Sequence, residues 1–380
     1  MTTISYDLAP AGSFPQSAPT LDDIERNFRS LITQMRLFPG AALAVSFNGR
    51  IILDLQGGLA DSQRGECVAP ETLFPLFSGT KPFTAVALWQ QVEQGRIALD
   101  DRVKDIWPAF GALGKERVLI EHLLSHRGGF PDTPPALPRS TWGDWQKATG
   151  AIAAMPLAYE PGAVSAYHFV NQHWVCAELV QQLDGRDIVS YVRDEITVPL
   201  QLHDTYLLLP ADLEPRLARL HATDGCDKRT LETVRALWEY PLHRMVVPGA
   251  SGVSTARDVA RFYAAIAAGG AIDGVRILSA ATVDRMLSLV VDGDHDLTLD
   301  VPVRRCYGFE LGGLEDPRRQ WPGRTSTERT FWHGGFGSSV CWGERDQGLA
   351  FAFLTNGVRR DAAGAIARRD LSDVVRSVTS

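Results

Sequence analysis

The chain has 380 residues, of which 45% are hydrophobic and 22% are charged, as in ordinary folded proteins. This length allows two or three structural units around a large core. The 45 Asp and Glu outnumber the 38 Lys and Arg, which gives a formal net charge of −7. No positive field is available to hold nucleic acid or an anionic membrane surface, and we expect neither as a partner.

The start of the chain, residues 1–19, is rich in Pro, Ser, Ala and Thr without periodicity, which predicts a flexible N-terminal arm. It has neither the basic start nor the apolar run of a secretory signal, and no later segment has the roughly 18 apolar residues of a membrane span. The five cysteines are widely spaced and form no C-x-x-C pair, which favours reduced thiols. We therefore expect a cytoplasmic protein.

Apolar side chains recur at helical spacing over residues 21–37, and the next two segments, 41–47 and 51–56, have the pattern of strands joined at Asn48-Gly49. The middle of the chain is dominated by helical patterns, at 78–95, 170–183, 187–195, 256–268 and 280–290. Strand patterns then return, at 306–312, 330–333, 340–345 and 349–356, and an amphipathic helix over 362–378 ends the chain.

This order of elements predicts an α+β fold, an α/β sandwich in which an antiparallel sheet is flanked by the N- and C-terminal helices. The sheet domain is expected to combine residues 20–77 with residues 300–380. A mainly helical domain, residues 78–299, is inserted between them. A cleft between two such units is a natural place for an active site.

The strongest chemical signal is Ser78-Gly79-Thr80-Lys81, an S-x-x-K motif that opens a helical pattern. One helical turn places the Ser78 hydroxyl and the Lys81 amine on the same face, so a neutral amine can take the hydroxyl proton during attack on a carbonyl. An N-cap serine followed by a solvated lysine is the alternative. A lysine in the first turn opposes the helix dipole, and residues 73–77 are apolar, which favours a chemical role.

Other catalytic motifs are missing from the sequence, which has no G-x-S-x-G, no H-E-x-x-H and no G-x-x-x-x-G-K-[ST]. The α/β-hydrolase, zinc-protease and P-loop classes are therefore disfavoured. Asp292, Asp294 and Asp296 imitate the start of a calcium loop, but Leu297 stands where Gly is needed and Val303 where Glu is needed. We predict a polar surface loop there, and expect the protein to need neither a metal nor a cofactor.

Together with four further stretches, the motif resembles the serine β-lactamase and penicillin-binding-protein superfamily, in particular its class C-like esterase branch, the family VIII-type carboxylesterases. The resemblance extends over about residues 20–375. The four stretches follow in order, at residues 120–129, at Pro161-Gly162 with Tyr167, at residues 252–258, and at His333-Gly334-Gly335 before residues 354–356.

The resemblance implies a β-lactamase-like fold and an acyl-enzyme on Ser78, with Lys81 as its partner and Tyr167 as a second proton-transfer group. A lysine ammonium beside Tyr167 is expected to lower the pKa of the phenol from about 10, so that a tyrosinate can act as base. A buried phenol with one structural hydrogen bond is the alternative for Tyr167.

The stretch His333-Gly334-Gly335 resembles the family's K-T-G strand, which lines the substrate pocket. By that match the backbone amides of Ser78 and Phe336 form the oxyanion hole. Two consecutive glycines allow a close approach of substrate to the strand.

Two departures from the family pattern concern substrate recognition. His333 replaces the usual Lys, and an imidazole is mostly neutral at pH 7, which weakens carboxylate binding. Tyr167 is followed by His168 and Phe169, so the family's Y-x-N is broken and the nearest amide is Asn171. Both changes disfavour penicillins and D-Ala-D-Ala peptides as substrates. His122 and His126 lie in the first matched stretch, where the resemblance implies a packing role.

The first hypothesis is a serine hydrolase that cleaves small carboxylic esters in two steps, with a small-molecule ester as its partner. Acyl transfer to an alcohol or amine, hydrolysis of a β-lactam or a D-amino-acid amide or peptide, and lactone opening use the same groups and stay open. A non-catalytic binding protein of the same fold is the alternative from another class, and the intact Ser78, Lys81 and Tyr167 disfavour it.

Overall fold

The computed structural model describes residues 20–133, 137–223 and 226–378, so the predicted arm 1–19 lies outside the described residues. A nine-stranded antiparallel sheet runs through the molecule in the order β3-β2-β1-β14-β13-β12-β11-β10-β9. Its strands are β1 Gly40–Phe47, β2 Arg50–Asp61, β3 Glu66–Cys67, β9 Val291–Asp296, β10 Val301–Arg305, β11 Glu310–Leu311, β12 Thr330–Gly335, β13 Ser339–Glu344 and β14 Leu349–Thr355. Because β1 pairs with β14 over its length, the sheet joins both ends of the chain, which confirms the predicted fold class.

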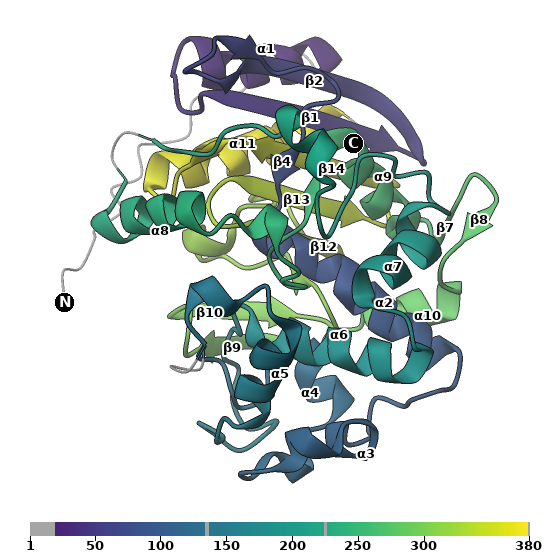
Figure 1. The fold of residues 1–380 in the computed structure, drawn as a ribbon. Coiled ribbons are helices and arrows are strands. Elements are labelled where there is room, and N and C mark those ends of the chain that lie inside the picture. The colour runs from purple at the N-terminus through teal and green to yellow at the C-terminus, as the bar shows by residue number, and fades with distance from the viewer. Residues whose placement is uncertain (1–19, 134–136, 224–225, 379–380) are drawn as a thin grey trace.

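Two helices cover one face of this sheet, α1 (Leu21–Thr33) and α11 (Ala362–Val378), as Figure 1 shows. Helix α1 contributes Ile24 and Phe28, one turn apart, which is the spacing of a single buried face. The facing residues include Trp332 and Trp342, a cross-strand pair of β12 and β13. Both indoles therefore belong to this core, on the side of the sheet covered by the terminal helices.

The opposite face of the sheet packs against α9 (Ala256–Ala267), below which α2 (Lys81–Glu93) and α6 (Asn171–Asp184) form the centre of the helical region (Figure 1). The other helices are α3 Val103–Ile106, α4 Ile120–Leu124, α5 Trp145–Ala153, α7 Ile188–Val192, α8 Lys228–Glu239 and α10 Ala280–Met286. Among the described residues, three two-stranded sheets lie outside the large sheet. They pair β4 Phe74–Pro75 with β6 Val253–Ser254, β5 His221–Ala222 with β15 Gly357–Val358, and β7 Ala271–Ile272 with β8 Val275–Arg276. Within the described ranges no helix has the length and apolar character needed to cross a bilayer.

Two local predictions were wrong. The segment with Asp292 and Asp296, expected to be a polar surface loop, is instead strand β9. Residues 292–295 are exposed as expected, but the side chain of Asp296 is fully buried, where it pairs with Arg305 on β10. The strand expected over 306–312 shortens to β11, because the chain turns at Gly308, with φ of +118°, and the Cys306 amide bonds to the Phe309 carbonyl.

The side chain of Asn356, directly after β14, forms hydrogen bonds to two other strands of the sheet. Its Oδ1 accepts a hydrogen bond of 2.8 Å from the Gly40 amide, and its Nδ2 donates to the carbonyls of Leu59 and Ala60 at 2.9 and 3.1 Å. The side chain is fully buried. One side-chain amide therefore connects the end of β14 to the start of β1 and the end of β2. These two strands come from the N-terminal part of the chain.

We expect Asn356→Ala to lower the free energy of unfolding by about 2–4 kcal/mol, because it leaves a buried amide and two carbonyls without their partner. Urea unfolding followed by circular dichroism measures this change. The control is Asn27→Ala on α1, where the side chain is partly exposed and we expect a change within about 0.5 kcal/mol. Equal changes in the two variants would contradict this role of Asn356.

Candidate active site

Ser78 lies in a 3₁₀ segment, Phe77–Thr80, that leads directly into α2. Phe77 has φ of +48°, a left-handed conformation that is costly for a bulky residue and that turns the chain sharply just before the serine. The preceding segment is held by the Leu76 amide, which donates to the Gly252 carbonyl at 2.8 Å. The nucleophile predicted from the motif therefore stands on a strained turn, at the start of a buried helix.

The Lys81 side chain is buried beside Ser78, with 1% of the residue exposed. Its Nζ lies 3.0 Å from Ser78 Oγ, 2.8 Å from the Phe169 carbonyl and 3.0 Å from the Gly249 carbonyl. Burial lowers the pKa of this amine from 10.5 to about 7, against an opposing effect of Glu310.

The three contacts of Lys81 define what its amine can do. The two carbonyls can only accept hydrogen bonds, so they take both N–H groups of a neutral amine. The lone pair is then left to face the Ser78 hydroxyl. A pKa near 7 means that a large fraction of Lys81 is neutral at neutral pH, so Lys81 can receive the proton of Ser78.

Tyr167 reaches the same point from the loop before α6. The phenol ring lies with its centroid 5.1 Å from Lys81 Nζ and 4.5 Å from the centroid of the His126 ring. Burial raises the pKa of Tyr167 well above 10, and the hydrogen bond with Ser78 opposes this only in part. The expectation that the neighbouring lysine lowers this pKa was therefore wrong, because burial dominates, and Tyr167 is a neutral phenol that can donate a proton.

A buried network of charges lies next to Tyr167. Arg305 on β10 donates to Asp296 at 2.7 Å and to Glu310 at 2.8 Å, and Glu310 also pairs with Arg319. The guanidinium carbon of Arg305 lies 5.8 Å from the centre of the Tyr167 ring, and the Tyr167 amide donates to Asp296 at 3.1 Å. Burial raises the pKa of both carboxyl groups, but Arg305 lowers it, together with backbone amides at Asp296 and with Arg319 at Glu310. The net shift is downward for both, so both stay ionised.

Sequence reasoning missed this network. The alternation of Val301 and Val303 with polar residues marks β10 as a strand with one buried face, and Arg305 falls on that face. Nothing in the pattern shows that Arg305 meets Asp296 and Glu310, because their pairing depends on the register of three strands.

Several histidines surround the same centre, and they are neutral. Burial lowers the pKa of His168 and of His333 to about 3, and places that of His126 and His173 well below 6.5. His168 fits a single tautomer, since its Nδ1 lies 2.7 Å from the Ala166 carbonyl while Nε2 accepts from the Phe130 amide. In the described part of the chain no three His, Cys, Asp or Glu side chains are grouped to hold a metal ion.

The residues expected to form the oxyanion hole lie on two adjacent segments. The β12–β13 hairpin turns at Phe336 and Gly337, with φ of +36° and +74°. A Cβ on Gly335 would collide with the Leu76 carbonyl, so this glycine lets β12 lie directly against the segment that carries Ser78. Among the described residues, neither the Ser78 nor the Phe336 amide donates to a protein acceptor, so both remain available to an oxyanion.

The other predicted pocket residues lie on the same strand. The His333 ring centroid is 6.3 Å from that of Tyr167, and its Nδ1 lies 2.9 Å from the Gly334 carbonyl. A Cβ on Gly334 would meet the Trp321 ring at 2.7 Å. The structure thus brings Ser78, Lys81 and Tyr167 together and places the strand 333–335 beside them.

A serine, a buried lysine and a tyrosine grouped beside strand β12 of an antiparallel sheet define a hydrolase of the β-lactamase-like class. A sequence model of the Beta-lactamase family matches residues 27–375, and the chain belongs to this family. It is 29% identical to the esterase/β-lactamase LipL of Mycobacterium tuberculosis, over 93% of this chain and 85% of that protein.

Solved structures give the same assignment. A penicillin-binding-protein homologue from Caulobacter crescentus is 28% identical, with a TM-score of 0.81 over 93% of this chain and 96% of that chain. A family VIII carboxylesterase is 25% identical, with a TM-score of 0.82 and the same coverage. The predicted β-lactamase-like fold is confirmed.

Replacing Arg305 with Met is expected to lower the free energy of unfolding at pH 8 by about 3–5 kcal/mol, because Asp296 and Glu310 lose a buried cation. Without Arg305 the pKa of each carboxyl group rises, so protonation relieves the cost and the loss is smaller at pH 5. Guanidinium unfolding at the two pH values measures both effects.

The matched control is Arg304→Met, the preceding residue on β10. Arg304 pairs at 2.8 Å with Asp292, whose side chain is more than half exposed, so we expect a loss of no more than about 1 kcal/mol at either pH. An equal, pH-independent loss in the two variants would show that Arg305 serves as packing rather than as the counter-charge of the network.

Proposed function

We propose that this protein is a serine hydrolase that cleaves small carboxylic esters through an acyl-enzyme on Ser78. The observation that carries the proposal is the buried Lys81 amine, 3.0 Å from Ser78 Oγ and with its remaining hydrogen bonds directed at two carbonyls. A structural lysine gains nothing from a position that brings its pKa to about 7, whereas a base for the serine hydroxyl needs such a value.

In the first step, Ser78 Oγ attacks the ester carbonyl carbon and its proton passes to the neutral Lys81 amine. The carbonyl oxygen becomes an oxyanion, to which the amides of Ser78 and Phe336 donate. In the second step, the tetrahedral intermediate collapses and the bond to the alcohol oxygen breaks. The neutral Tyr167 phenol donates a proton to that oxygen and is reprotonated from the Lys81 ammonium, so the alcohol leaves uncharged.

Hydrolysis of the acyl-enzyme repeats these transfers in reverse. Water attacks the acyl carbon in place of the alcohol, and its proton passes through Tyr167 to Lys81. Collapse of the second intermediate breaks the bond to Ser78 Oγ, which recovers its proton from the Lys81 ammonium. The two reaction steps together need one base and one phenol, which exchange a single proton.

Esters are favoured over β-lactams and peptides by the state of two side chains. His333 is buried and neutral, so it does not supply a cation for a substrate carboxylate beside the reacting centre. Asn171 is fully buried and its Nδ2 donates to the carbonyls of Phe130 and Asp132, so the amide is used within the fold rather than turned toward a substrate. Ester cleavage requires neither contact.

A direct test is intact-protein mass spectrometry after brief exposure to p-nitrophenyl acetate, p-nitrophenyl butyrate and a chromogenic cephalosporin, with Ser78→Ala as control. We expect a mass increase of one acyl group from the esters, absent in Ser78→Ala, together with release of p-nitrophenol. Turnover of the cephalosporin alone would replace the ester assignment with a lactamase assignment, and no adduct from any of the three would contradict the acyl-enzyme.

The pKa of Lys81 predicts a pH profile. Because the neutral amine is the active form, kcat/KM for p-nitrophenyl acetate should rise about tenfold per pH unit below pH 7 and level off above it, with an apparent pKa near 7. In Tyr167→Phe we expect the same apparent pKa and a plateau lower by about 10²–10⁴-fold. If the apparent pKa of the kcat/KM profile shifts in Tyr167→Phe, the titration belongs to the tyrosine instead.

A further inference from the structure

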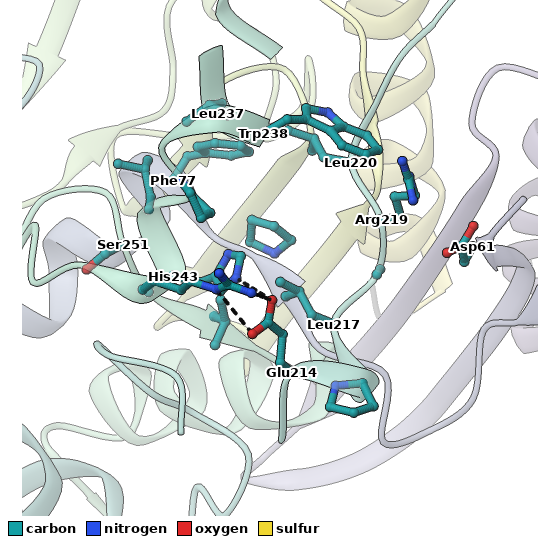
Figure 2. Close-up of a pocket in the computed structure, with 18 of the residues that line it drawn as sticks. Asp61, Phe77, Glu214, Leu217, Arg219, Leu220, Leu237, Trp238, His243 and Ser251 are labelled. Atoms are coloured by element: carbon teal, nitrogen blue, oxygen red, sulfur yellow. Dashed lines mark hydrogen bonds and ion pairs between the residues drawn. The ribbon is translucent and has the colours of Figure 1, made fainter. Parts of the chain in front are cut away.

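A cavity of about 620 Å³ opens beside the segment that carries Ser78 (Figure 2). It lies between Phe77, the 3₁₀ segment Ala211–Arg216, the end of α8 at Leu237 and Trp238, and residues 250–253. This volume is within the range of small-molecule sites in proteins. An acetyl or butyryl group would leave most of it empty.

The position of the cavity relative to Ser78 indicates which part of an ester it takes. Phe77, which lines it, is joined by a peptide bond to the nucleophile, and its ring packs 5.7 Å from the ring of Phe336. The leaving alcohol must be protonated by the Tyr167–Lys81 pair, and neither of these residues lines the cavity. Among the residues placed in the site, the cavity borders none of the catalytic groups themselves, only Phe77, the neighbour of the nucleophile. An acyl chain on Ser78 that extends past Phe77 would enter the cavity, whereas the alcohol would leave toward the proton-transfer pair.

The walls of the cavity are apolar on one side and charged on the other. Figure 2 shows Phe77, Leu237 and Trp238 along one side, with Glu214 and His243 across from them. Three of the four carboxylates at the wall have cationic partners: Glu214 pairs with Arg244, and Arg64 lies within 3.8 Å of Asp61 and Glu66.

Arg219 is held differently from the other two arginines at the wall, Arg64 and Arg244. Its guanidinium stacks on Trp238, 3.8 Å from the ring centroid, and its Nε is buried without a hydrogen-bond partner. Its charge acts on the Asp61 carboxylate, but among the described residues no hydrogen bond or ion pair joins the two side chains. Stacking holds the planar group in place, and because Nε is buried, the two terminal nitrogens are the donors left to bind a carboxylate in two parallel hydrogen bonds.

We propose that this cavity is the acyl pocket and that Arg219 is a specificity-determining residue, which binds a carboxylate at the far end of the acyl chain. The preferred substrates are then half-esters of dicarboxylic acids, whose methylene chain lies along the apolar wall. The inference rests on the proposed ester hydrolysis and adds the class of acyl group to it.

The experiment compares kcat/KM for p-nitrophenyl hexanoate with that for the mono-p-nitrophenyl esters of adipic and suberic acid, which place a carboxylate at the end of a six- or eight-carbon chain. All three share one leaving group, so their ratio reports the acyl pocket. We expect the better half-ester to exceed the hexanoate by about 10- to 100-fold, as for a hydrogen bond between charged groups. Arg219→Met should remove this preference.

The matched control is Arg235→Met on α8, an exposed arginine outside the cavity, which changes the net charge equally and should keep the preference within about twofold. A second variant, Ala211→Trp, fills the cavity from its exposed rim and should lower the ratio of hexanoate to acetate turnover by at least about tenfold. Melting temperatures of all variants check that each is folded.

The outcomes separate the two proposals. If Ser78 is acylated by p-nitrophenyl acetate, but Arg219→Met keeps the wild-type ratio, the acyl-pocket role of Arg219 is wrong and ester hydrolysis stands. The role of Arg219 is also wrong if the wild-type protein prefers the hexanoate to both half-esters. If no ester acylates Ser78, the proposed function fails and this inference fails with it.

Discussion

The removal of one lysine amine from water is the constraint on which the site depends. Lys81 can stay buried because the Phe169 and Gly249 carbonyls accept its hydrogen bonds, and these come from segments 88 and 168 residues further along the chain. Both segments must therefore be packed on α2 before the amine has its partners. Gly249 allows this approach, since a Cβ there would lie 3.1 Å from His173 and 3.5 Å from Lys81 Nζ.

The charges around this amine set its proton affinity. Burial lowers the pKa of Lys81, and the ionised Glu310 raises it again, so that the value stays near neutrality. Glu310, on β11, can remain ionised although it is buried, because Arg305 and Arg319 pair with it. The network next to Tyr167 thus acts on the base as well, although none of its members bonds to Lys81.

Much of this arrangement could be predicted from the sequence, because local spacing carries it. The S-x-x-K motif fixes Ser78 and Lys81 within one turn, and the period-2 and period-3.6 patterns gave the terminal helices and central strands. The pKa of Tyr167 was predicted in the wrong direction, because the degree of burial is a tertiary property. The same holds for Asp296. Its acidic neighbours in the sequence predicted a surface position, but the pairing of β9 with β10 buries its side chain.

The neutrality of His333 has a consequence for where anionic groups can be recognised. A permanent cation at that position would stand beside Lys81 and lower the pKa of its amine further, as Lys81 now lowers that of His333. It would also attract a carboxylate to the reacting carbon. Because burial keeps the His333 imidazole uncharged, it neither lowers the pKa of Lys81 through a positive charge nor draws a substrate carboxylate toward Lys81 and Tyr167. Any recognition of an anionic group then belongs at a distance from the reacting centre, where an arginine such as Arg219 does not disturb the base.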